Sequence, residues 1–200
     1  MKKWQGYIGG VRISVDFWFL VMLLAVLLTR QELLLWYFLL PVLLHECGHL
    51  LAMLICGMGI EGVAFGAFSI AIQRGGSPAS PGRELAVALA GVAANLAVAA
   101  GFYFFVFPSL RAMLFTAVNL AVALFNLAPI ADLDGGQALR LLLEQRASFL
   151  LAQRLSRVIS FLLLVPLFAA GVFLVLRDPG QFSLLLVCLY LAGRVLFAVG

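Results

Sequence analysis

The chain has 200 residues, of which 64% are hydrophobic and only 11% charged, and its formal net charge is +4. A soluble domain has about half apolar and a quarter charged residues, and a disordered chain is poorer still in apolar residues. The composition therefore excludes both classes and predicts an integral membrane protein. The lysines and arginines form no run longer than Lys2–Lys3, which argues against a nucleic-acid partner. The three cysteines have no paired spacing, so we expect no disulfide framework.

Charge-poor stretches predict an all-α polytopic membrane fold with about six transmembrane helices, most of them near the roughly 20 residues that a bilayer core requires. The expected ranges, in chain order, are 13–29, 33–56, 84–107, 111–128, 158–176 and 181–198. A short helix is expected at about 135–147, emerging into water. No small-residue cleavage site follows the first apolar run, so we expect a retained helix there rather than a signal peptide. The whole of residues 1–200 is expected to form a single transmembrane core.

The segment between the second and third expected helices is not expected to be helical itself, because its many glycines disfavour a helix. Residues 61–73 contain β-forming side chains among small residues. Non-helical backbone at membrane depth needs protein or a water-filled cavity to satisfy its polar groups. We therefore predict a short re-entrant β-hairpin at about 61–73. An ordinary interfacial loop is the alternative.

The distribution of basic residues predicts the orientation of the chain, because six spans place both termini on one side. The loops on that side would carry Lys2, Lys3, Arg12, Arg74, Arg83, Arg140, Arg146, Arg154 and Arg157. The opposite loops would carry only Arg30, Arg111 and Arg177. Basic residues gather in cytoplasmic loops. Both termini are therefore expected to be cytoplasmic.

The chain contains two histidines, and both lie in the sequence His45-Glu46-Cys47-Gly48-His49, inside the second expected helix. Residues four apart share a helical face, so both imidazoles can bind one metal ion, and Glu46 is placed to act on its water. A pair of buried histidines bonded to neighbours is the alternative. Ionisable groups inside a membrane are costly and usually functional, which favours the metal site. Zinc is the expected ion, since this motif on a helix commonly holds it.

A catalytic zinc site has three protein ligands and one open position, so the third ligand must come from elsewhere. Only Asp132 and Asp134 among the acidic residues lie against an apolar run outside the histidine motif. Pro129 breaks the preceding helix and the glycines that follow free the backbone, so a carboxylate can turn inward there. A plain loop with a helix cap is the alternative for this stretch. Spacing alone does not choose between the two aspartates.

The two motifs together, the histidine motif in an apolar helix and then Asn126-x-x-Pro129 with Leu133-Asp134-Gly135, resemble the site-2 protease family of intramembrane zinc metalloproteases. The resemblance is closest to the compact, sporulation-type branch, without that branch's C-terminal nucleotide-sensing domain. It implies that Asp134 completes the zinc site, that Glu46 is the general base, and that Asn126 helps to hold substrate or the oxyanion. Asn95 is a further, minor candidate, since the family's pattern in the third helix is only partly kept here.

The resemblance also implies one Zn²⁺ ion per chain and a membrane-spanning protein as substrate, such as a transcription-factor precursor, an anti-sigma factor or a remnant signal peptide. A regulatory membrane partner and a bacterial cytoplasmic membrane are expected, with the active site open to the cytoplasm. Three further classes are alternatives. They are a zinc-binding or zinc-transporting membrane protein without hydrolytic activity, a different membrane metalloprotease that trims prenylated or other C-terminal tails, and an inactive scaffold derived from a protease. The Leu133-Asp134-Gly135 arrangement after Asn126-x-x-Pro129 argues against the second. The presence of Glu46 argues against a scaffold, which has no need of a base.

Overall fold

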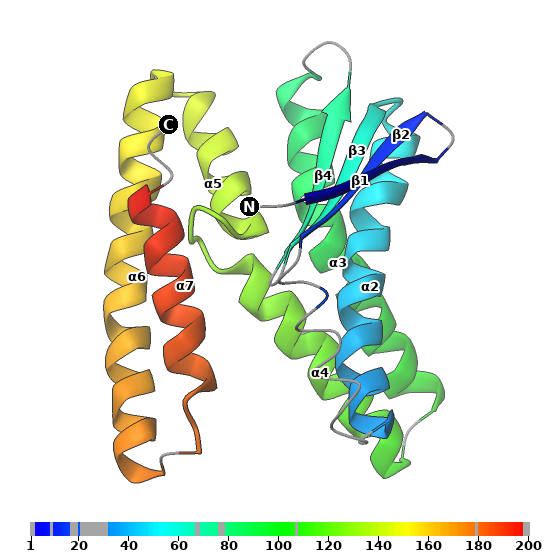
Figure 1. Cartoon of the computed structure of the whole chain (residues 1–200), viewed down its shortest axis with the longest axis vertical. Coiled ribbons are helices and arrows are strands. Elements are labelled where there is room, and N and C mark those ends of the chain that lie inside the picture. Colours follow the sequence, from blue (N-terminus) through cyan, green and yellow to red (C-terminus); the bar gives the residue numbers. More distant parts are fainter. Residues whose placement is uncertain are drawn as a thin grey trace. The chain divides into compact units, whose positions relative to one another are not determined.

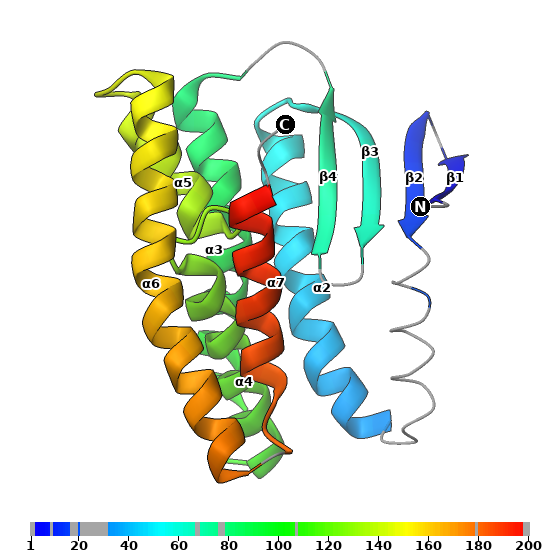
Figure 2. The ribbon, with the colours of Figure 1, turned by 60° about the vertical axis from the view of Figure 1, so that its left-hand side comes forward.

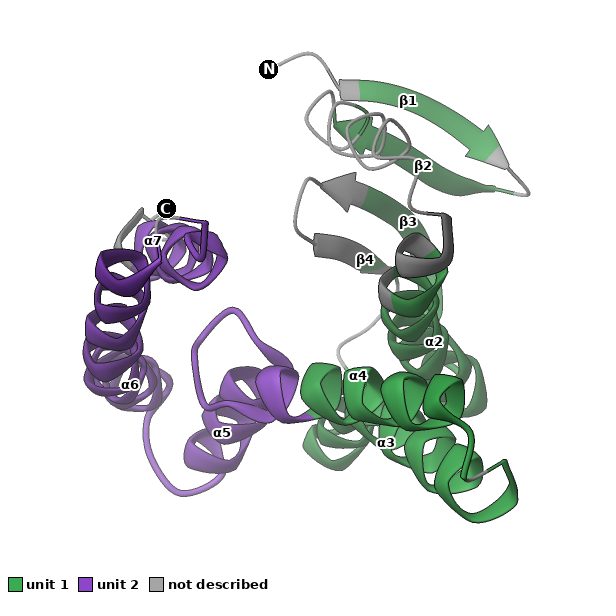
Figure 3. Ribbon diagram, turned by 90° about the horizontal axis from the view of Figure 1, so that it is seen from below, with its two compact units in different colours: residues 1–123 green, residues 124–200 purple. Residues whose placement is uncertain are grey.

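The computed structural model of the chain describes residues 3–8, 10–16, 20, 32–66, 69–75, 79–106, 108–178 and 180–197. They fall into two compact units, unit 1 (Met1–Ala123) and unit 2 (Leu124–Gly200), which Figure 3 colours separately. The described residues are mostly helical, with one small β-sheet in unit 1 (Figure 1).

The sheet of unit 1 has four strands in the order β1-β2-β3-β4 (Figure 2). β1 (Lys3–Ile8) and β2 (Val11–Asp16) form an antiparallel hairpin. β3 (Gly59–Gly66) and β4 (Ser69–Gly75) form a second one, and β2 pairs with β3 in parallel. The strands expected at 61–73 are therefore present, within a larger sheet than the sequence predicted. The placement of this hairpin in a membrane stays a prediction.

The expectation of a first helix over 13–29 is wrong for residues 13–16, which belong to β2. Apolar and polar residues alternate from Val11 to Asp16, which is the period of a half-buried strand. Pairing with β3 keeps this segment in the sheet. Of the remaining residues of that expected span, only Leu20 is among those described, and it is helical.

The helices of unit 1 are α2 (Glu32–Ile55), α3 (Pro81–Phe105) and most of α4 (Leu110–Leu127). α2 ends in a Schellman motif: Gly57 has a φ of 67° and donates to Leu54 O, and Met58 N donates to Met53 O. This turn leads the chain directly from α2 into β3. α3 starts with Pro81, whose fixed φ suits the first helical position.

Close contact between α2 and α3 depends on small residues. A Cβ atom placed on Gly48 of α2 would lie 2.7 Å from the carbonyl oxygen of Ala90 and 2.8 Å from Cβ of Ala94 on α3. No side chain fits in that space, so the two helix backbones approach each other at this level. The histidine motif of α2 therefore packs directly against the middle of α3.

Unit 2 contains α5 (Asp134–Glu144), α6 (Phe149–Arg177) and α7 (Ser183–Phe197). α6 packs against both α5 and α7. The core of this unit contains Leu164 of α6, Leu191 and Val195 of α7, and Ile130 and Leu133 from the loop before α5. α6 begins at Phe149, well before the expected start at 158. Arg154 and Arg157 interrupt the apolar pattern but are good helix formers, so the helix continues through them.

Three of the described helices, α3, α4 and α6, are long and apolar enough to cross a membrane. Leu39–Ile55 and Ser183–Val195 are shorter apolar helices. With 64% hydrophobic residues in the chain, these helices identify an integral membrane protein. The number of spans stays a prediction.

Candidate metal centre

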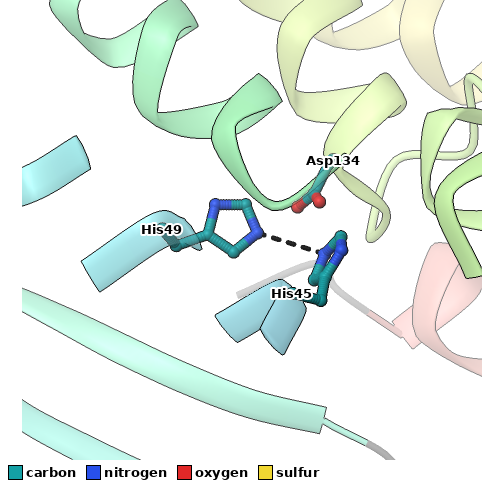
Figure 4. A group of neighbouring side chains, drawn as sticks. All are labelled: His45, His49 and Asp134. Carbon is teal, nitrogen blue, oxygen red and sulfur yellow. Dashed lines mark hydrogen bonds between the residues drawn. The ribbon is translucent and has the colours of Figure 1, made fainter. Parts of the chain in front are cut away.

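The two histidines lie on one face of α2 and are both buried, with exposed fractions of 4% for His45 and 9% for His49. Their rings meet edge to face, with centroids 4.8 Å apart. The Nε2 atoms face each other at 3.2 Å (Figure 4). The i, i+4 spacing of the sequence motif therefore brings two ligand atoms to one point, as expected.

The orientation of His49 is set by α3. Nδ1 of His49 lies 2.8 Å from the carbonyl oxygen of Val87, so Nδ1 carries the hydrogen and donates it. In a neutral imidazole this leaves the lone pair on Nε2, the atom that faces His45. Histidines that bind metals commonly donate their other ring N–H to a carbonyl or carboxylate in this way.

The separation of the two Nε2 atoms fits a zinc ion. Zinc–nitrogen bonds measure about 2.0–2.1 Å. Two nitrogens 3.2 Å apart that both bind one zinc ion at that length subtend an angle of about 100°, close to the tetrahedral value. The separation of the two nitrogens is therefore compatible with a tetrahedral metal ion.

The two imidazoles can lie close to α3 because residue 91 is a glycine. A Cβ atom on Gly91 would collide with Nε2 of His49 and would lie 2.7 Å from both Cε1 and Nε2 of His45. The two rings therefore lie directly against the backbone of α3 at Gly91, where no side chain fits. Gly91 belongs to the buried face of α3.

Asp134 lies in unit 2, at the first position of α5. The two glycines that follow it allow the chain to fold tightly there. A Cβ atom on Gly135 would collide with the carbonyl of Leu127, and one on Gly136 with the carbonyl of Ile130. The loop from Leu127 to Leu133 thus packs directly on the start of α5, and Asp134 is held on a rigid helical turn rather than on a mobile loop.

His45, His49 and Asp134 are a group of residues that could together hold a metal ion. Two imidazoles and one carboxylate are a ligand set of catalytic zinc sites. The chemistry of this donor set therefore fits the expected ion.

The segment around the second motif is similar to a known protein family. Residues 109–170 match the model of Peptidase family M50. The resemblance to the site-2 protease family is thus confirmed, and the matched segment includes both Asn126 and Asp134.

Two similar proteins extend the comparison with family M50. The chain is 31% identical over 156 residues to the protein named "Putative zinc metalloprotease Rip3" in two strains of Mycobacterium tuberculosis. The match covers 70% of this chain and 36% of that protein, so the chain spans about a third of the relative's length. The solved structure "Site-2 Protease from Methanocaldococcus jannaschii" shares the fold, with a TM-score of 0.69 over 97% of this chain and 94% of that one, at 20% identity.

The other candidate residues of this M50 relative lie at defined places, and their roles stay predictions. Glu46 is half-buried on α2, and Asn126 is half-buried in the last turn of α4. Asn95 is fully buried and donates from Nδ2 to the carbonyl of Pro41 at 3.3 Å. This bond joins α3 to α2 one turn beyond Gly91, so Asn95 supports the helix that carries the histidines.

The sequence did not reveal which residues hold the Asp134 loop. Arg194 of α7 binds the carboxylate of Asp132, and Ser160 of α6 accepts a hydrogen bond from Ala131 N at 2.8 Å. The partners are 62 and 29 positions apart. No local pattern in the sequence indicates such pairs.

Proposed function

We propose that the chain is an intramembrane zinc metalloprotease that hydrolyses a peptide bond in or near the transmembrane segment of a membrane-tethered protein. The observation that carries this proposal is the geometry of the two buried imidazoles, whose Nε2 atoms lie 3.2 Å apart. The match to the model of Peptidase family M50 and the similarity to a protein named as a putative zinc metalloprotease support the same conclusion.

In this proposal His45, His49 and Asp134 would hold one zinc ion. A zinc ion held there would lower the pKa of a bound water to about 7 and would polarise the scissile carbonyl. The hydrogen bond from His49 Nδ1 to the Val87 carbonyl keeps the ring in the tautomer that this role requires.

Glu46 is the general base. It accepts a proton from the attacking water and later passes this proton to the leaving amine. Its place on α2, next to His45, holds the carboxylate on the same rigid element as two of the ligands. The side-chain amide of Asn126 is proposed to donate to the oxyanion, which stabilises the charge that develops in the transition state.

A transmembrane helix is a poor substrate because its amides are all hydrogen-bonded, so a stretch of it must unwind and be held extended. β4 lies at the end of the strand order, so it offers an unpaired backbone edge within the described sheet. An extended peptide can join such an edge through main-chain hydrogen bonds, which make little demand on sequence. We therefore propose loose sequence specificity, governed by how easily the substrate helix unwinds.

The proposed substrates are membrane-tethered regulators, such as a transcription-factor precursor or an anti-sigma factor, or remnant signal peptides. Both termini and the opening of the active site are proposed to face the cytoplasm, on the basis of the charge distribution in the loops. A regulatory membrane partner would then control the access of substrate.

The test uses the full chain in proteoliposomes with a single-span membrane substrate, and zinc is counted in the same samples. Glu46→Gln is expected to abolish cleavage and to retain zinc, because the amide cannot accept the proton. Glu144→Gln is the matched control: it removes a carboxylate from the far end of α5, where Glu144 pairs with Arg140 at 3.6 Å. It should cleave as wild type does.

Zinc bound without cleavage by wild type, across a panel of single-span substrates, would contradict the protease. A zinc-flux assay on the same liposomes would then test the transport alternative. Wild type without bound zinc would contradict the metal centre itself.

A further inference from the structure

The short loop that precedes Asp134 is held by a residue from the last helix of the chain. Nε of Arg194 donates to Oδ2 of Asp132 at 2.9 Å, and its NH2 group lies 3.4 Å from Oδ1. Both oxygens of the carboxylate are thus engaged by one guanidinium, in the fork geometry that arginine favours. Asp132 stands two residues before the proposed metal ligand Asp134.

Two other contacts fix the same loop within unit 2. Ala131 N donates to Ser160 Oγ on α6, and Ser160 in turn donates to the carbonyl of Ser156 at 2.7 Å. Ile130 and Leu133 belong to the apolar core that α6 and α7 supply. The loop is therefore held by one backbone bond to α6, by apolar packing, and by the ion pair with α7.

α7 presents the residues that make these contacts on one face. Arg194 and Val195 follow Leu191 by three and four residues, so both are neighbours of Leu191 on the helix surface. Leu191 and Val195 are buried in the core that contains Ile130 and Leu133. Arg194 extends the same face to Asp132, so the position of α7 and the course of the loop depend on each other.

The ion pair is only partly buried, with exposed fractions of 55% for the Arg194 side chain and 23% for that of Asp132. Pairs of this kind contribute little to global stability. Their effect is local, because they select one arrangement of two groups that could otherwise separate. Here the arrangement selected is that of the loop immediately before Asp134.

We propose that Arg194 is a positioning residue for the metal centre: by holding Asp132, it fixes the loop that presents Asp134 and keeps a second carboxylate from competing for the metal. This inference rests on the proposed function, since it assigns Asp134 as a ligand. It also explains why two aspartates so close in sequence, between which spacing alone does not choose, have different roles.

The experiment measures zinc retention by the purified full chain against a graded series of a zinc chelator, with the thermal unfolding midpoint recorded for each variant. Arg194→Gln and Asp132→Asn are each expected to weaken zinc binding about tenfold, the usual cost of losing an outer partner of a ligand. The double variant should lose no more than either single variant, because the two residues act as one pair. Cobalt substitution adds a spectroscopic readout, since its visible absorption reports the coordination geometry.

Arg177→Gln is the matched control, since it removes the same charge from the end of α6, where the guanidinium lies 4.9 Å from the Phe173 ring centre. It should retain zinc and the wild-type cobalt spectrum. The use of variants on α7 and on the loop keeps the test valid if one of them fails to fold.

Wild-type zinc retention by folded Arg194→Gln would overturn the inference, as would additive losses in the double variant. Neither result would contradict the proposed function. The proposed function is contradicted instead if the wild-type chain binds no zinc.

Discussion

The replacement of Gly91 by alanine tests the metal centre most directly, because it adds a single methyl group against the Nε2 atoms of both histidines. The new Cβ would lie 2.7 Å from His45 Nε2 and would collide with His49 Nε2. Ordinary contact between such atoms needs about 3.5 Å. The imidazole of His45 would therefore have to retreat by about 0.8 Å, and that of His49 by more.

That displacement is large compared with what a metal site tolerates, since ligand distances are held to about 0.2 Å. We therefore expect Gly91→Ala to lower zinc affinity by more than the 10–100-fold that loss of an outer partner costs. Overpacking at this level should also lower the free energy of unfolding by about 1–3 kcal/mol. Cleavage should fall with zinc occupancy.

Gly101→Ala is the control, because Gly101 lies on the same helix and a Cβ atom there meets nothing within 4 Å. The assay titrates zinc into the chelator-treated full chain in detergent and measures bound metal by elemental analysis, with thermal unfolding in parallel. Gly91→Ala with wild-type zinc affinity would refute the argument, since it would mean that the imidazoles do not need their present positions to bind the ion.

Two further variants test the rest of the site. Gly135→Ala would place Cβ against the carbonyl of Leu127 and 2.8 Å from that of Ala128, so we expect a loss of about 1–3 kcal/mol in the free energy of unfolding, measured by denaturant titration. Stability equal to that of Gly101→Ala would contradict this packing. Ala71→Pro removes a backbone N–H from β4 and should lower cleavage while zinc is retained, whereas Gln5→Pro on β1, the other end of the sheet, should cleave as wild type does. Equal cleavage by both would disprove substrate binding at β4.

The arrangement of the histidine motif could be predicted because it depends only on residues close together in the sequence. The i, i+4 spacing of His45 and His49 fixes their common face as soon as the segment is a helix, and an apolar segment of that length is one. The strands at 61–73 were predictable for a similar reason, since β-forming side chains are interleaved there with small residues. The choice of Asp134 over Asp132 came from the resemblance to a family and not from spacing.

What the sequence did not reveal depends on contacts between distant segments. The parallel pairing of β2 with β3 joins residues 12–15 to residues 62–65, and an apolar stretch after Asp16 made the N-terminal segment resemble the start of a helix. The ion pair of Arg194 and Asp132 likewise joins two elements 62 positions apart. Gly91 looks in the sequence like one more small residue in a stripe of them, because the groups that need its space lie on another helix.

The tight contact of α2 with α3 has a consequence for motion. Gly48 and Gly91 each leave a notch that is filled by the opposite helix, by Ala90 and Ala94 in one case and by the two imidazoles in the other. If α2 moved along α3 by one residue, about 1.5 Å along the helix axis, a side chain would enter a space that has no room for it. The pair α2 and α3 is therefore expected to move as one rigid body. Any rearrangement that admits a substrate must then be made by other segments, while the histidines stay in register.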